Sequence, residues 1–156
     1  MSFATAFRVD EPRARISERY EETLDALEGA LLRLPNDHDR PAEEERVRDV
    51  EAPRSFCPGK NALGYNDDGT ERKYAGVAQR VTQEAALVSG VVVVESGDEI
   101  RRVLSDIYSA LGVDFEPETV GGLDDAGFGV SVSRVARGLR EALEDEAGGD
   151  AGVGRA

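Results

Sequence analysis

Two side chains suited to acyl chemistry stand close together in the sequence. Cys57 is the only cysteine, and Lys73 is one of two lysines among 156 residues. A thiolate is a strong nucleophile when a nearby cation lowers its pKa. An ammonium group polarises an acyl carbonyl as negative charge develops on the carbonyl oxygen. Cys57 and Lys73 are therefore a candidate acyl-transfer pair.

Lysine is rare in this chain, which has seventeen arginines but only Lys60 and Lys73. Arginine cannot replace an ammonium group whose pKa responds to burial, so a lysine retained at position 73 favours a chemical role. Two plainer interpretations remain open, namely Lys73 as a solvent-facing hairpin residue and Cys57 as a small buried hydrophobic residue. The sole histidine, His38, lies in a charged segment without further metal ligands, so neither a Cys–His pair nor a metal site is expected.

Length and composition favour a single acidic domain. The net charge of −13 and the pI near 4.5 argue against a nucleic-acid partner, which needs a basic surface. Excess acid and scarce lysine resemble adaptation to high salt, where screening relieves self-repulsion. The chain begins without a typical secretory signal, and its apolar runs are shorter than the roughly 20 residues of a membrane helix. We expect a halophilic cytoplasmic protein with a domain at 1–147 and a disordered tail at 148–156.

The spacing of apolar residues predicts three helices. They are expected at 16–34, 100–111 and 132–143. Pro35 should end the first helix, and a capping box at 96–99 should begin the second, which Gly112 ends. The charged, proline-punctuated segment 36–51 is expected to form a surface loop, and the glycine-rich segment 121–129 a linker.

Short apolar runs predict the strands of a sheet. They lie at 3–9, 63–65, 73–79 and 85–94. The sequence Asn66-Asp67-Asp68-Gly69 is typical of a tight turn and predicts a hairpin between the second and third runs. The last run is apolar at almost every position, which predicts a core strand covered on both faces.

The motifs around the candidate pair resemble the lipoate-protein ligase and octanoyltransferase family, which shares the biotin/lipoate protein ligase catalytic domain. The resemblance lies in Cys57-Pro58-Gly59…Leu63, followed by Arg72-Lys73-Tyr74-Ala75-Gly76-Val77-Ala78-Gln79-Arg80. The family segments read roughly C-x-x-G/S-x-x-x-L, a turn, and G-x-K-x-x-G-x-A-Q-x-R. The similarity continues through 85–90 and more weakly through 100–111, and it covers about two-thirds of the chain.

The resemblance implies a fold, an activity and roles for particular residues. The fold would be α+β, with a mixed or antiparallel sheet packed with helices, forming a partial ligase-like domain. Lys73 matches the lysine that contacts the acyl carbonyl, and Cys57 matches the nucleophile of cysteine-dependent octanoyltransferases. Gly76, Ala78 and Gln79 match a strand whose small residues leave room for the acyl chain.

The substrates and partners follow from the same resemblance. A lipoyl or octanoyl group would be transferred to a lysine on the lipoyl carrier domain of a 2-oxoacid dehydrogenase or a glycine cleavage protein. Lipoate or octanoate would be the substrate, and ATP with Mg²⁺ would be used if the reaction passes through an adenylate. No tightly bound cofactor is expected.

The chain departs from the family before its first strand. An arginine- and glycine-rich loop of the R-R-x-x-G-G type has no counterpart here, so the chain is expected to be an incomplete gene model, one half of a split enzyme, or an inactive paralogue. The alternative is a non-catalytic subunit. It would complete another ligase half through the free edge of a strand at 3–9. A biotin-protein ligase is a weaker alternative, because the cysteine segment is not expected in that group.

Overall fold

The computed structural model describes residues 1–8, 15–34, 43–57, 60–95 and 97–148. It contains one antiparallel sheet with the strand order β1-β5-β4-β3-β2. The strands are β1 Ser2–Arg8, β2 Arg48–Asp49, β3 Ala62–Asp67, β4 Thr70–Val81 and β5 Ala85–Val92. The helices are α1 Ile16–Leu32, α2 Glu43–Arg46, α3 Gly97–Leu111 and α4 Val132–Gly148, with a 3₁₀ turn, η1, at Pro117–Thr119. The predicted α+β class is confirmed.

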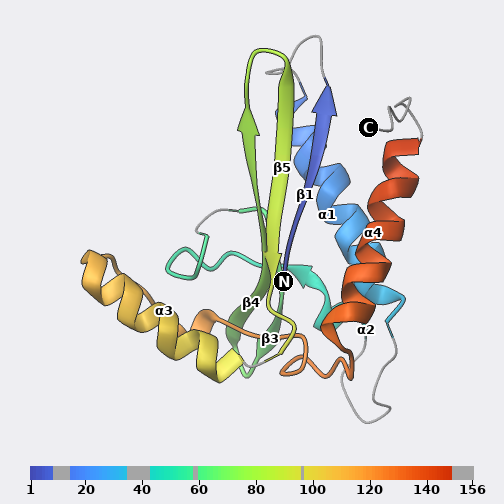
Figure 1. Ribbon diagram of the computed structural model, residues 1–156. Helices are drawn as coiled ribbons and strands as arrows, with labels where there is room; N and C mark the ends of the chain where they lie inside the picture. The colour runs from blue at the N-terminus through green and yellow to red at the C-terminus, as the bar shows by residue number, and fades with distance from the viewer. Residues whose placement is uncertain (9–14, 35–42, 58–59, 96, 149–156) are drawn as a thin grey trace.

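Two of the helices cover one face of the sheet. Helix α1 packs on β3, β4 and β5, and α4 packs on α1 (Figure 1). Leu27 and Leu31 of α1 and Leu139 of α4 are buried in the core that these elements enclose. The helical spacing read from the sequence is therefore confirmed for both helices, because burial of one apolar stripe is what positions them.

Strand β5 has one covered face and one open face. Its burial alternates along the strand, so that Val88 and Val92 are buried while Leu87 and Val91 are 40% and 37% exposed. The prediction that this strand is covered on both faces is therefore wrong. On this second face, Leu87 is exposed and Val91 lines a hollow shared with α3.

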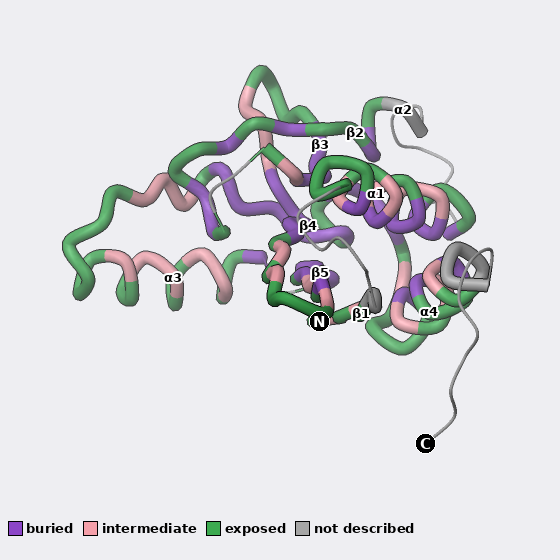
Figure 2. Tube along the Cα trace, turned by 90° about the horizontal axis from the view of Figure 1, so that it is seen from above, coloured by how far each residue is buried: buried purple, intermediate pink, exposed green. Residues whose placement is uncertain are grey.

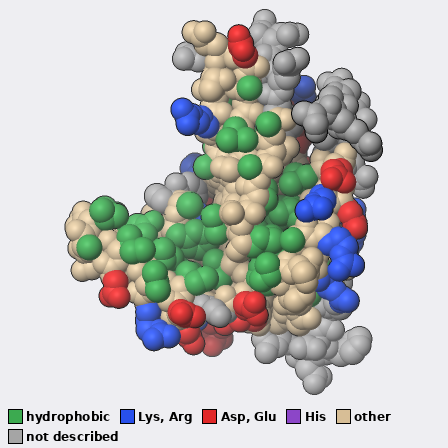
Figure 3. All heavy atoms as spheres, in the orientation of Figure 1, with side chains coloured by type: hydrophobic (Ala, Val, Ile, Leu, Met, Phe, Trp, Pro, Cys, Tyr) green, Lys and Arg blue, Asp and Glu red, His purple; other side chains and the backbone are tan. Residues whose placement is uncertain are grey.

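Helix α3 projects away from the sheet (Figures 1 and 2). The helix and its end at Gly112, which has a φ of +64°, are as predicted. Of the expected buried face, Ile100 and Leu104 are partly buried against the core, whereas the other three residues are exposed. Val103, Ile107 and Leu111 are 52%, 46% and 69% exposed. Hydrophobic side chains continue from α3 across the neighbouring surface of the sheet (Figure 3). A contiguous exposed apolar surface of this kind is typical of an interaction site or a ligand-binding groove.

The segment expected to be a surface loop at 36–51 carries regular structure in its second half. Helix α2 and strand β2 lie there, and Arg46, Val47 and Val50 are buried. The Tyr74 hydroxyl donates a hydrogen bond of 3.0 Å to the carbonyl of Arg46. The loop prediction is wrong for 43–50, because tertiary contacts outweigh the charged composition. The part at 36–42 lies outside the described residues.

The glycine-rich segment at 121–129 belongs to the core and is not a linker. The Leu123 amide donates to the Val93 carbonyl at 3.0 Å, and the Asp124 amide donates to the Val94 carbonyl at 3.1 Å. The Leu123 and Phe128 side chains are buried. The linker prediction is wrong because the backbone groups of this glycine-rich segment pair with the chain that follows β5.

Two further expectations fall partly or wholly outside the described residues. The capping serine at position 96 lies outside them, although α3 begins at the next residue. The expected tail at 148–156 is described only at Gly148, the last residue of α4. Within the described part of the chain, no helix has the length and apolar content needed to cross a membrane.

Candidate functional site

A bulge in the β3–β4 hairpin turns Lys73 toward the open face of the sheet. Leu63 pairs with Ala75 and Gly64 pairs with Lys73, so Tyr74 has no partner on β3. An extra residue of this kind re-aims the neighbouring side chain. The Lys73 side chain consequently runs over Gly76, where a Cβ atom would lie only 2.7 Å from Lys73 Cε.

The Lys73 side chain is buried and its amine is held in place. Only 1% of the residue is exposed, so the solvent-facing interpretation is wrong. Nζ donates a hydrogen bond of 2.6 Å to the Cys57 carbonyl and lies 5.1 Å from the centre of the Phe56 ring. The Gly121 amide donates to the Lys73 carbonyl at 2.9 Å. Contacts from the segment 56–57 and from Gly121 therefore fix this lysine.

Burial changes the acidity of this amine. Desolvation lowers the pKa of Lys73 from its ordinary value of 10.5, and the nearby Cys57 thiol group, when ionised, opposes that shift. The folded protein therefore releases the Lys73 proton at a lower pH than the unfolded chain. A buried amine with a lowered pKa is a common feature of functional sites.

This shift predicts a pH dependence of stability that Lys73→Met should remove. Between the lowered folded pKa and 10.5 the unfolded chain binds more protons, so the Lys73 contribution to the free energy of unfolding rises with pH in that window. Denaturant unfolding from about pH 7 to 10.5 should show the native chain gaining stability relative to Lys73→Met.

The exposed Lys60 supplies the control for this experiment. Lys60→Met should leave the pH dependence unchanged, because the Lys60 side chain is 86% exposed. Tyr65, whose pKa burial raises to about 12, lowers stability above about pH 10 in all three proteins and cancels in the comparison. Parallel curves for the native chain and Lys73→Met would contradict the prediction.

Cys57 lies at the open surface beside this lysine. The residue is exposed, so the interpretation of Cys57 as a small buried hydrophobic residue is wrong. Its φ of +47° lies in the left-handed region, which residues other than glycine seldom adopt. The hydrogen bond from Lys73 to the Cys57 carbonyl helps to hold this conformation.

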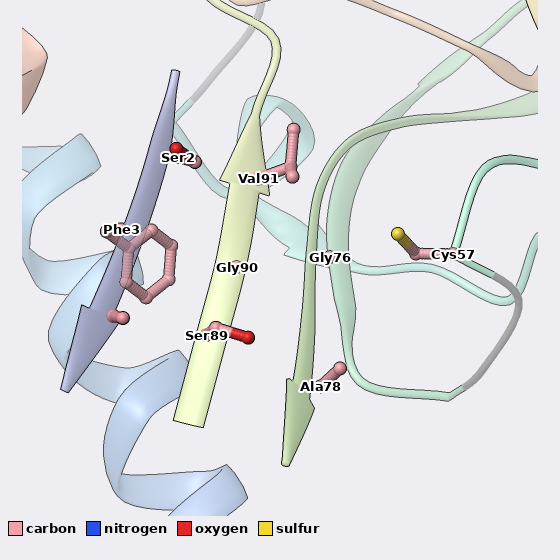
Figure 4. A pocket seen from close by; sticks show the side chains of 9 residues that line it. Ser2, Phe3, Cys57, Gly76, Ala78, Ser89, Gly90 and Val91 are labelled. Carbon is pink, nitrogen blue, oxygen red and sulfur yellow. The ribbon is translucent and has the colours of Figure 1, made fainter. Parts of the chain in front are cut away.

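Two apolar hollows meet at Cys57. The first has a volume of about 480 Å³ and lies on the open face of β1, β5 and β4, where Gly76, Ala78 and Ser89 contribute to its wall (Figure 4). The second, of about 350 Å³, lies between the end of β5 and α3. Cys57 and Val91 line both hollows, and the Cys57 side chain points toward β4 (Figure 4). A thiol in this position has apolar space on two sides.

Gln79 lies on the opposite face of β4 from this site. Its side-chain oxygen accepts a hydrogen bond of 3.2 Å from Arg19, and its backbone amide donates to the Tyr20 hydroxyl at 2.8 Å. Successive residues of a strand point to opposite faces, so Ala78 and Gln79 cannot line the same hollow. The structure brings together Lys73, Cys57, Gly76 and Ala78, and it places the Gln79 side chain against α1.

Sequence reasoning missed residues that build this site from other segments. Phe56 supplies the ring beside the Lys73 amine, and Val120 forms a parallel bridge with Lys73. Phe56 stands next to Cys57 in the chain, so its aromatic character was an available signal. The contact with Val120 had no local signal, because it joins segments that are distant in the sequence.

The described residues do not present a metal centre. They contain no group of three histidine, cysteine, aspartate or glutamate residues arranged to hold a metal ion. Mg²⁺ that accompanies ATP is usually held by substrate phosphates and one or two carboxylates rather than by a dedicated protein cage.

Comparison with solved structures relates this arrangement to known proteins. A lipoate-protein ligase A bound with ATP superposes with a TM-score of 0.60 over 94% of this chain and 51% of its own length, at 18% sequence identity. The chain has a partial lipoate-ligase-like fold. No family model and no curated protein matches this lipoate-ligase-like domain at the level of sequence.

Two Thermoplasma acidophilum structures show the same relationship. One, with bound lipoic acid, has a TM-score of 0.59 and 19% identity over 94% of this chain and 51% of its own. The other, a bi-partite lipoate protein ligase studied with its E2 lipoyl domain, has a TM-score of 0.59 and 16% identity over the same shares. The lipoate-ligase-like domain therefore spans about half the length of these proteins.

Proposed function

We propose that this chain is the acyl-handling part of a lipoate-protein ligase or octanoyltransferase. It would transfer a lipoyl or octanoyl group to a lysine of a lipoyl carrier domain. The observation that carries the proposal is the buried Lys73 amine, held 2.6 Å from the carbonyl of Cys57, the residue that lines both apolar hollows. Such hollows suit an alkyl chain, and the amine suits its carbonyl group.

Lys73 would act on the acyl carbonyl. Its Nζ now donates to a carbonyl oxygen of the chain itself, and an acyl carbonyl oxygen is an equivalent acceptor. When a nucleophile adds to the acyl carbon, negative charge develops on that oxygen. A donor fixed by burial stabilises this charge more than water does, because it does not have to reorient.

Cys57 would carry the acyl group. Its thiolate attacks the acyl carbon, a C–S bond forms, and the bond to the leaving group breaks with the electron pair going to the leaving group. The deprotonated amine of the carrier lysine then attacks the thioester, and an amide forms as the thiolate leaves and takes up the proton that the amine loses. In an adenylate route the carrier amine would instead attack an acyl-adenylate directly, and AMP would leave without a thioester.

A direct experiment tests whether a lipoyl or octanoyl group is the substrate. The chain, with the rest of the ligase fold supplied in cis or in trans, is incubated with octanoyl-adenylate or lipoyl-adenylate and a lipoyl carrier domain. Intact-mass spectrometry should detect an acyl group on the carrier lysine and, in the absence of carrier, on Cys57. Acylation of neither protein with either donor would refute the proposal. A biotin-protein ligase would instead accept biotinyl-adenylate.

A second candidate function is a non-catalytic subunit that completes another ligase half. The features that favour it are the exposed apolar faces of α3 and β5 and the position of β1 at the edge of the sheet. The bi-partite ligase among the similar structures is a precedent for division between chains. This candidate requires a stable complex on size exclusion in which Lys73→Ala leaves acyl transfer unchanged.

A further inference from the structure

Gly76 stands where a side chain would block the path of Lys73. A Cβ atom at position 76 would lie 2.7 Å from Cε and 3.0 Å from Nζ of Lys73, and the first distance is shorter than real Cβ contacts. The φ angle of Gly76 is not among the positive values found at Gly69, Gly112 and Gly127. The backbone at position 76 therefore does not require glycine, and the requirement is for space.

The path over Gly76 leads to the Cys57 carbonyl. Lys73 Nζ donates to that carbonyl at 2.6 Å, and Cys57 has a left-handed backbone conformation. The same Cβ at position 76 would lie 3.7 Å from Cys57 Cβ, which is an ordinary contact. A side chain at position 76 would thus disturb Lys73 first and reach Cys57 only through it.

We propose that Gly76 is a positioning residue for Lys73 and, through Lys73, for the Cys57 segment. The space left by its missing side chain lets the amine cross β4 and hold the Cys57 carbonyl beside the first hollow. The catalytic consequence rests on the proposed function: one N–H of the Lys73 ammonium group is directed at the Cys57 carbonyl, and Gly76 thereby also sets the position of the remaining donors that an acyl carbonyl would meet. The room at Gly76, attributed to the acyl chain from the sequence, is occupied by the lysine.

The scarcity of lysine makes this proposal testable inside one molecule. Trace acetic anhydride labels the amines of Lys60 and Lys73, and peptide mass spectrometry gives both rates across the pH range. At the alkaline plateau both amines are neutral, so the ratio of the rates reports access to Lys73 against the exposed Lys60. Gly76→Ala should raise that ratio by up to about tenfold, the upper end of the range expected for losing one hydrogen bond between neutral groups.

Ala78→Ser is the matched control, because it adds one atom to the same face of the same strand and to the same hollow. It should leave the labelling ratio unchanged. The pH at which Lys73 labels half-maximally should also rise in Gly76→Ala, since the displaced amine regains water, and should stay constant in Ala78→Ser. A folded Gly76→Ala chain with the native ratio and native labelling profile would overturn the proposal.

A double variant covers the case in which Gly76→Ala does not fold. If the obstruction is the lysine, Lys73→Ala combined with Gly76→Ala should fold as well as Lys73→Ala alone in thermal unfolding. Failure of the double variant to fold would overturn the proposal, because the alanine would then clash with something else. None of these measurements uses acyl transfer. They therefore test the role of Gly76 separately from the proposed function, and one can fail while the other holds.

Discussion

Replacing Lys73 by alanine is expected to lower the rate of acyl transfer by about 10² to 10³, the range found when a single donor to a developing oxyanion is removed. The reason is that the buried amine is placed to stabilise charge on the acyl oxygen, and water entering the gap would have to reorient to do so. The measurement is the rate of carrier acylation from octanoyl-adenylate, with the rest of the ligase fold supplied.

Arginine at position 73 should not restore this rate. A guanidinium group is larger than an ammonium and presents a planar fork of donors, which does not fit the narrow path over Gly76. Lys60→Ala is the control and should transfer at the native rate, because the Lys60 side chain lies in solvent. A Lys73→Ala protein with native transfer would remove Lys73 from the mechanism.

Replacing Cys57 by serine is expected to abolish the acyl-thioester and to slow transfer by about 10³ or more, the scale on which loss of a covalent nucleophile is felt. Serine keeps the size of the side chain but not the acidity of the thiol, so the hollow should still accept the acyl group. Intact-mass spectrometry in the absence of carrier detects the intermediate directly, since Cys57 is the only thiol.

The same variant separates the two routes of transfer. A fully active Cys57→Ser protein would contradict the covalent route and favour direct attack of the carrier amine on an acyl-adenylate. Lys73→Ala should be slow by either route, because the charge on the acyl oxygen develops in both. The two variants together therefore distinguish a failure of the covalent step from a failure of the whole assignment.

Some elements followed from local chemistry and could be read directly from the sequence. The turn at 66–69 joins β3 and β4 as expected, with Asp68 and Gly69 at φ values of +48° and +87° and the Asn66 side chain accepting from the Gly69 amide. Helices α1, α3 and α4 followed from the spacing of apolar residues. These features depend on residues close together in the chain, so local preference was enough.

Other features depended on partners that are distant in the chain. The segment 121–129 was expected to be a linker, yet its amides pair with carbonyls at Val93 and Val94. The predicted burial of the apolar faces of β5 and α3 is also wrong in part. An apolar residue in the sequence does not indicate which element, if any, will pack over it. The motif places Gln79 in the site, but its side chain lies on the α1 face of the sheet. A sequence motif gives the order of residues and not the face of the strand to which each side chain points.

The sequence by itself determined which chemistry is available: one thiol, one lysine in a glycine-marked strand, and a hairpin to carry that lysine. Tertiary structure alone decided that the amine reaches Cys57, where it donates to the backbone carbonyl. The bulge at Tyr74 changes the face on which Lys73 lies, and strand register is set by pairing across the sheet. Without that extra residue, Lys73 and Gly76 would point to opposite faces, and the amine could not reach Cys57.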